Sequence, residues 1–120
     1  MTSIERLHST PRMSKIVRYG GLLFLCGQTA KGSANASADV SAQTLEVLSR
    51  IDALLAEAGS DRTRLLAVTI YLRDISDFAA MNAVWESWIT PDTAPARTTI
   101  EARLATPGLL VEMTVIAATA

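Results

Sequence analysis

The chain has 120 residues, of which 49% are hydrophobic and 19% are charged, and its formal net charge is −1. These values predict a single globular domain, residues 1–120, with enough apolar side chains for a core, and they exclude a disordered chain. The near-zero charge argues against the clustered lysines and arginines that nucleic acid binding requires.

Cysteine usage and the lengths of the apolar runs indicate the compartment. Cys26 is the only cysteine, so no intramolecular disulfide can form, which fits a reducing environment. The first residues lack a basic region followed by an apolar stretch, and the longest apolar run, residues 22–26, is too short to span a bilayer. We therefore expect a cytoplasmic protein without a membrane partner.

The N-terminal half predicts three strands and then a helix. Residues 4–8 form a weak strand candidate, and residues 15–18 and 22–29 are two strands joined by a hairpin at Gly20 and Gly21. The small, polar residues 30–38 predict a loop, which we expect to be mobile. A helix capped by Ser37 or Asp39 should follow and end at Gly59. Its apolar stripe consists of Val40, Thr44, Val47, Leu48, Ile51, Leu54, Leu55 and Ala58.

The C-terminal half predicts a strand, a helix and a final hairpin. Residues 65–73 alternate, with Leu66, Val68, Ile70 and Leu72 on one face. Ser76 should cap a helix that runs to about Ile89, and its stripe is formed by Phe78, Met81, Trp85 and Trp88, the tryptophans being expected in the core. Two last strands, 97–104 and 109–118, are separated by a turn at residues 105–108.

The order β-β-β-α-β-α-β-β predicts an α+β fold, with a mixed sheet of about five to six strands and two helices packed on one face. The other face would then be bare and partly apolar, which an isolated domain tolerates badly. Association of subunits is the simplest way to cover it.

The candidate site lies on the last two strands. Their period of two puts Arg97, Thr99, Glu112 and Thr114 together on the bare face, if the apolar faces align against the helices. A salt bridge or a solvated pair is the commoner meaning of an arginine and a glutamate on neighbouring strands. The functional alternative is that Arg97 holds a carboxylate bidentately while Glu112 orients a water molecule. The pattern alone leaves both open.

Other chemistry-bearing residues are weaker candidates. His8, the only histidine, has no partner at a recognisable spacing for a catalytic triad or a metal site, so we expect a surface or structural residue. Cys26 lies in a buried-looking strand without a basic neighbour, which predicts an inert thiol. The glycine-containing segments match neither a phosphate loop nor a dinucleotide fingerprint. No metal or organic cofactor is predicted.

Several segments together resemble the Rid family, also called YjgF. They are Leu23-Phe24-Leu25-Cys26-Gly27-Gln28, Gln43-Thr44, Asp77-Phe78-Ala79-Ala80-Met81-Asn82, Ala94-Pro95-Ala96-Arg97-Thr98-Thr99, Val111-Glu112-Met113 and Ile116-Ala117. The match runs over nearly the whole chain. Its most specific part is the Pro95-x-Arg97 element with Glu112 fifteen residues after the arginine.

The resemblance implies a chorismate-mutase-like α+β subunit and a homotrimer with three clefts between subunits. In active members the arginine matching Arg97 holds the carboxylate of a 2-imino acid, and the glutamate matching Glu112 positions the attacking water. The backbone at the position matching Thr99 contacts the substrate nitrogen. The products are a 2-oxo acid and ammonia, and no cofactor is used.

Three positions depart from the family pattern. Met13 stands where many deaminase members carry a cleft tyrosine, Cys26 where serine is common, and Thr99 where the archetype has cysteine. These changes indicate a divergent subgroup, in which Met13, Cys26 and Thr99 would line the substrate site with Arg97. The leading hypothesis is hydrolysis of reactive 2-imino or enamine acids. The alternative is a non-catalytic module that binds a small carboxylate, a 2-oxo or amino acid, in the same inter-subunit cleft.

Overall fold

A computed structural model describes residues 3–120, so Met1 and Thr2, part of the N-terminus that we read for a signal peptide, lie outside the described residues. The strands are β1 (Ile4–Ser9), β2 (Ser14–Tyr19), β3 (Leu22–Gln28), β4 (Leu65–Leu72), β5 (Ala96–Glu101) and β6 (Val111–Ala118). The α-helices are α1 (Val40–Glu57) and α2 (Phe78–Trp88), and two 3-10 turns, η1 (Arg62–Arg64) and η2 (Ile75–Asp77), precede β4 and α2. The predicted order of elements is confirmed, and the last two strands are shorter than expected.

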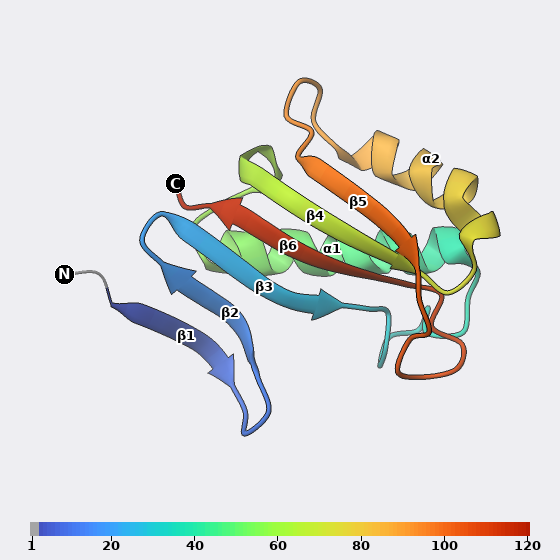
Figure 1. Cartoon of the computed structure of the whole chain (residues 1–120), viewed down its shortest axis with the longest axis horizontal. Helices are drawn as coiled ribbons and strands as arrows, with labels where there is room; N and C mark the ends of the chain where they lie inside the picture. Colours follow the sequence, from blue (N-terminus) through green and yellow to red (C-terminus); the bar gives the residue numbers. More distant parts are fainter. Residues whose placement is uncertain (1–2) are drawn as a thin grey trace.

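The strands form one mixed sheet in the order β1-β2-β3-β6-β4-β5 (Figure 1). All neighbouring pairs are antiparallel except β4 and β5, which are parallel. The predicted hairpin between the last two strands is therefore wrong. After β4 the chain crosses over through α2 and returns as β5, parallel to β4 at the edge of the sheet, as in a βαβ unit. Residues 102–110 then lead past β4, so that β6 lies at the centre of the sheet.

Helix α1 covers one face of the sheet, behind the strands in the view of Figure 1. Its N-cap is Asp39, whose side chain accepts a hydrogen bond from the backbone N–H of Ala42 at 2.9 Å, so Asp39 and not Ser37 is the cap. Gly59 follows with φ of +78°, which confirms the predicted stop. The buried residues of the helix are Val40, Gln43, Thr44, Val47, Leu48, Ile51 and Leu55.

Helix α2 begins differently from the prediction. The backbone N–H and the hydroxyl of Ser76 both donate to Asp74, at 2.9 and 2.7 Å, so Ser76 belongs to η2 and does not cap α2. Met81 and Trp85 are buried in the core, whereas Phe78, at the first turn, is 42% exposed. Phe78, which belongs to the predicted apolar stripe, is thus not part of the core.

Strand β4 contains an irregularity that shifts its predicted apolar face. Leu65 pairs with Ala117 and Ala67 with Ile116, so Leu66 is an extra residue and is 45% exposed. Val68, Ile70 and Leu72 face the helices as predicted, and Leu65 takes the buried place expected for Leu66.

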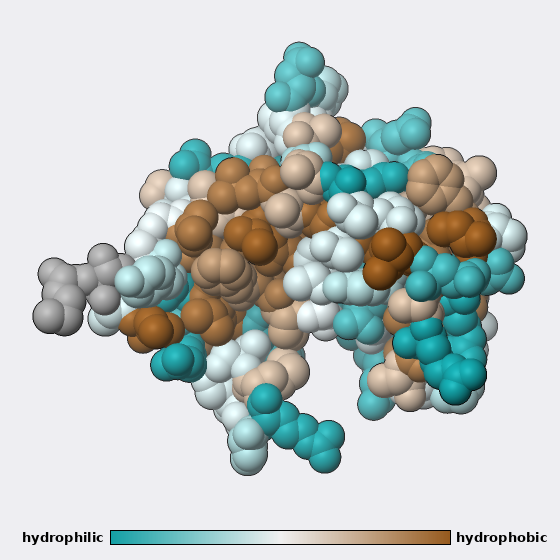
Figure 2. All heavy atoms as spheres, in the orientation of Figure 1, coloured by the Kyte–Doolittle hydropathy of each residue, from teal (hydrophilic) through white to brown (hydrophobic). Residues whose placement is uncertain are grey.

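The other sheet face is bare, as the alternation predicts. A row of directly paired residues, Val17, Phe24, Ile116 and Ala67, crosses four strands on this face. Figure 2 shows apolar side chains gathered there, over the ends of β3, β6 and β4 nearest the C-terminus. Tyr19, Leu22 and Phe24 are 49%, 38% and 38% exposed. No helix within residues 3–120 is long and apolar enough to cross a membrane.

Candidate active site in two halves

Arg97 lies on the face of the sheet that the helices cover. The row of directly paired residues through Arg97 consists of Ile16, Leu25, Val115, Val68 and Arg97 itself. The first four are buried at 3% exposure or less, so Arg97 ends a core row at the edge strand. Its guanidinium carbon lies 5.4 Å from the ring centroid of Trp85 and 5.8 Å from that of Phe78.

This position changes the electrostatics of Arg97. Burial lowers the pKa of the Arg97 guanidinium, and the nearby carboxylate of Glu86 partly opposes that shift. The group remains a cation at neutral pH, because the guanidinium is a far stronger base than any other side chain and burial lowers its pKa only in part. Neither Arg97 nor Glu112 takes part in any of the four ion pairs among residues 3–120. A partly desolvated cation that forms no ion pair within residues 3–120 favours a bound anion.

Two polar atoms beside Arg97 also lack partners. Thr99 Oγ1 and Asn82 Oδ1 are buried and accept or donate no hydrogen bond within residues 3–120. Thr99 follows Arg97 by two residues on the same face, and Asn82 lies one helical turn after Phe78 on α2. Buried polar atoms without partners are rare because leaving them unpaired costs about 1–3 kcal/mol each. Thr99 Oγ1 and Asn82 Oδ1 are therefore candidate contact atoms of the site.

Asn82 was not predicted as a site residue, although it stands in one of the segments that resemble the Rid family. The available signal was its spacing. Asn82 follows Phe78 by four residues and precedes Trp85 by three, so all three lie on the same face of α2. This spacing places Asn82 between the two rings that face Arg97.

Glu112 lies on the bare face, in a row with Tyr71 and Ile100. Its carboxylate reaches over Gly27: a Cβ atom at that glycine would lie 2.1 Å from Glu112 Oε2. The pairing of β3 with β6 is irregular there, since Leu25 pairs with Val115 and Gln28 with Met113. The irregularity and the missing side chain together make room for the carboxylate.

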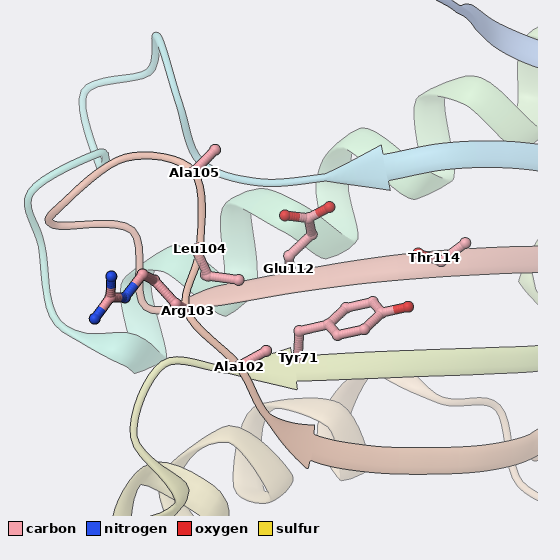
Figure 3. A pocket seen from close by; sticks show the side chains of 7 residues that line it. All are labelled: Tyr71, Ala102, Arg103, Leu104, Ala105, Glu112 and Thr114. Atoms are coloured by element: carbon pink, nitrogen blue, oxygen red, sulfur yellow. The ribbon is translucent and has the colours of Figure 1, made fainter.

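A hollow of about 290 Å³ opens beside Glu112 (Figure 3). Figure 3 shows the Glu112 side chain directed from β6 toward β3, while the Arg103 side chain points away from Glu112. The residues that line the hollow are Tyr71, Ala102, Arg103, Leu104, Ala105, Glu112 and Thr114.

Arg97 and Glu112 are therefore on opposite faces of the same sheet, and the prediction that they share the bare face is wrong. Strand β4 lies between their strands, which separates them by about 10 Å within the sheet alone. The prediction assumed a hairpin in which the apolar positions of both strands face the helices. On the real edge strand, Thr98 and Ile100 face outward instead, and Arg97 and Thr99 face the helices. The salt-bridge alternative fails for the same reason.

Cys26 lies on the Glu112 side. It is half-buried, and its sulfur accepts a hydrogen bond from Gln28 Nε2 at 3.2 Å. Burial raises the pKa of the Cys26 thiol and Glu112 adds to the rise, while Lys15 opposes it. The expectation of no basic neighbour is thus wrong, because Lys15 comes from the adjacent strand. The raised pKa nevertheless agrees with an inert thiol.

Met13 and His8 lie far from Arg97 within the subunit. Met13 is 43% exposed in the turn between β1 and β2. Strand β2 is four strand positions from β5, or about 19 Å. His8 bonds to the Glu57 carboxylate at the surface, as expected of a structural residue. Residues 3–120 contain no group of three or more histidine, cysteine or acidic side chains placed to hold a metal.

The fold defines a class of small α+β proteins seen in solved structures. A YjgF family protein from Neisseria meningitidis superposes with a TM-score of 0.90 at 42% identity, over 98% of this chain and 96% of that one. A RutC family protein from Haemophilus ducreyi is 40% identical over 115 residues, 96% of each chain. The RutC family protein YoaB of Escherichia coli is 37% identical over 116 residues, covering 97% of this chain and 98% of its own.

The family model described as endoribonuclease L-PSP matches residues 3–119. The chain belongs to this family, which includes the YjgF and RutC proteins, and the resemblance to the Rid family is confirmed.

Proposed function

We propose that the protein hydrolyses reactive 2-imino and enamine acids to 2-oxo acids and ammonia, in clefts between the subunits of a homotrimer. The observation that carries this proposal is the separation of Arg97 and Glu112 onto opposite faces of one sheet. A small substrate cannot touch both within a subunit. Arg97 of one subunit and Glu112 of its neighbour can meet across an interface.

In this proposal, Arg97 binds the substrate carboxylate through two parallel N–H···O bonds. The rings of Trp85 and Phe78 hold the guanidinium at 5.4 and 5.8 Å, which limits its rotamers before substrate arrives. Partial burial also removes competing water, so the attraction for an anion is stronger than at an open surface. The unpartnered oxygens of Thr99 and Asn82 are available for the polar groups of the bound molecule.

Glu112 serves as the base. A protonated imine is already electrophilic at carbon, so catalysis requires chiefly a fixed anion and a positioned water. The water adds to that carbon and gives a proton to the Glu112 carboxylate, which returns it to the nitrogen. The resulting carbinolamine carries a hydroxyl and an –NH3+ group on one carbon. It loses ammonia as its hydroxyl proton passes back to Glu112, which leaves the 2-oxo acid, and ammonia then takes that proton and departs as ammonium. The missing side chain of Gly27 leaves room for the Glu112 carboxylate itself, and the hollow lined by Tyr71 and Thr114 holds the water.

The homotrimer would also cover the bare apolar face. Exposed Phe24, Leu22 and Tyr19 form a contiguous patch with the partly exposed Ile116. Patches of this kind mark protein interfaces. In the trimer Met13 and Cys26 would line the cleft on the Glu112 side, with Arg97 and Thr99 on the other.

The test is turnover of 2-iminobutanoate, generated in place and followed by competition with semicarbazide. Arg97→Ala should lower kcat/KM by at least about a hundredfold, because a bidentate charged pair is lost, and leave the oligomer intact by light scattering. Arg64→Ala is the matched control, since the side chain of that exposed arginine hydrogen-bonds the backbone oxygen of Thr119 and belongs to neither half of the candidate site. If wild-type protein leaves the semicarbazide signal unchanged over a panel of imines, the proposal is wrong.

A second candidate is the non-catalytic carboxylate-binding module. The observation that favours it is Met13, whose thioether donates no hydrogen bond and accepts only weakly, at a position where a cleft tyrosine is expected. In this case 2-oxobutanoate raises the melting temperature of wild type but not of Arg97→Ala, and no imine is turned over.

A further inference from the structure

A second hollow, which contains two arginines, lies at the carboxyl ends of the parallel strands β4 and β5. It encloses about 310 Å³ and is lined by Arg73, Glu101, Ala102 and Arg103. Leu72 and Glu101 are register partners, so the chain leaves both strands at the same level. The N–H of Ala102 donates to Leu72 O at 2.9 Å and that of Arg73 to Leu110 O at 3.0 Å. These bonds place Arg73 beside the segment that carries Arg103.

The arginines of this hollow lack partners. None of the ion pairs among residues 3–120 includes Arg73 or Arg103. Arg73 Nη1 is buried and has no acceptor in that part of the chain. Glu101, the only acid lining the hollow, instead accepts a hydrogen bond from the N–H of Ile75 at 3.0 Å through Oε1. The hollow thus carries two cations, one anion and a buried guanidinium N–H without an acceptor, which is costly unless an anion supplies one.

We propose that this hollow is a second binding site, for a small oxyanion such as the phosphate or carboxylate group of a metabolite. Two guanidinium groups can share the oxygens of one such group, and Arg73 Nη1 gains the acceptor that it lacks. The site is separate from Arg97. Glu101 is four residue steps from Arg97 along the extended strand, or about 13 Å away. It adjoins the hollow beside Glu112, with which it shares Ala102 and Arg103.

The experiment measures anion binding calorimetrically at low ionic strength, on the full chain carrying Arg97→Ala. That background removes the other candidate anion site and makes the result independent of whether the protein turns over imines. The probes are inorganic phosphate and oxalate. In this background Arg73→Gln, and separately Arg103→Gln, should weaken binding about tenfold.

Glu101→Gln should change the anion affinity in the opposite direction from the arginine variants. The amide oxygen can still accept from Ile75, but the negative charge at the hollow is gone, so binding should tighten roughly threefold to tenfold. Arg64→Ala should change nothing. Tighter binding of phosphate assigns the site to phosphate monoesters, and tighter binding of oxalate assigns it to carboxylates. Absence of binding by both probes, or binding that Arg73→Gln leaves unchanged, overturns the proposal.

Discussion

The Glu112 carboxylate occupies the space that a side chain at Gly27 would fill. A Cβ atom there would lie 2.1 Å from Oε2 and 3.0 Å from Cδ of Glu112. These residues lie 85 positions apart, on β3 and β6, and the irregular pairing between these strands brings the glycine under the acid. The glycine of the Cys26-Gly27-Gln28 segment is thus required by the position of the proposed base.

Gly27→Ala should therefore displace Glu112 without unfolding the protein. We expect turnover of 2-iminobutanoate to fall by about tenfold to a hundredfold, because a shift on the order of 1 Å is costly in catalysis. The free energy of unfolding should change by less than about 1 kcal/mol, since the half-exposed Glu112 side chain can rotate away. Gly21→Ala is the control, because its Cβ would meet only Thr119 Oγ1, at 4.0 Å. Equal activity of the two variants would count against Glu112 as the base.

Gln43 joins the start of α1 to the segment that borders the Glu112 hollow. It is fully buried, its Nε2 donates to Ala38 O at 3.0 Å and Gly108 O at 2.8 Å, and its Oε1 accepts from Leu110 N–H at 2.8 Å. Gln43→Leu leaves three backbone groups without partners and should lower the free energy of unfolding by about 3 kcal/mol in urea titrations. Gln28→Leu should cost less, because the side-chain hydrogen bonds of Gln28 both go to Cys26 in its own strand. The reverse order would show that Gln43 does not hold the segment.

Asp52 connects the two helices. It accepts from Arg62 Nε and Nη2 at 3.1 and 2.5 Å and from Trp88 Nε1 at 2.9 Å. Arg62 also donates to Trp88 O at 2.6 Å and stacks 4.7 Å from its ring. We expect Asp52→Ala to destabilise the protein by about 2 kcal/mol, because three charge-assisted bonds are lost at a half-buried position.

The control for Asp52 is Glu46→Ala, which removes the single pair between Glu46 and Arg50 within α1. Such i,i+4 pairs contribute about 0.3–0.5 kcal/mol. Both variants are compared by urea unfolding at the same pH and salt concentration. Similar losses in the two variants would contradict a linking role for Asp52.

Cys26 should make stability depend on pH on the alkaline side. Burial raises the pKa of its thiol in the folded state. Below the ordinary pKa of about 8.5 the thiol is neutral in both states and contributes nothing to the dependence. As pH rises above that value, the unfolded chain loses its thiol proton and the folded chain retains it, so stability falls. Cys26→Ala should have a shallower decline between about pH 8 and 10 than wild type in urea midpoints. Parallel declines would show that the thiol does not contribute.

Much of the fold follows from local patterns. The glycine hairpin before β3, the α1 stripe and the alternation of β6 each depend on neighbouring residues, and each was predicted within a few positions. The errors within elements also have local causes. Leu66 is displaced by an irregularity in pairing, and Ser76 bonds to Asp74 in place of capping α2. Neither competing contact has a distinct signal in a single sequence.

The candidate site was likewise predicted correctly within each strand and wrongly between strands. The sequence by itself determined that Arg97 and Thr99 share one face of a strand, and that Glu112 and Thr114 share one face of another, because strand side chains alternate with period two. Only the tertiary structure decided that those faces are opposite. Alternation within a strand says nothing about its neighbour, and the parallel crossover through α2 sends β5 to the edge while β6 enters the centre. Long-range pairing thus places the guanidinium under Trp85 and the carboxylate over Gly27.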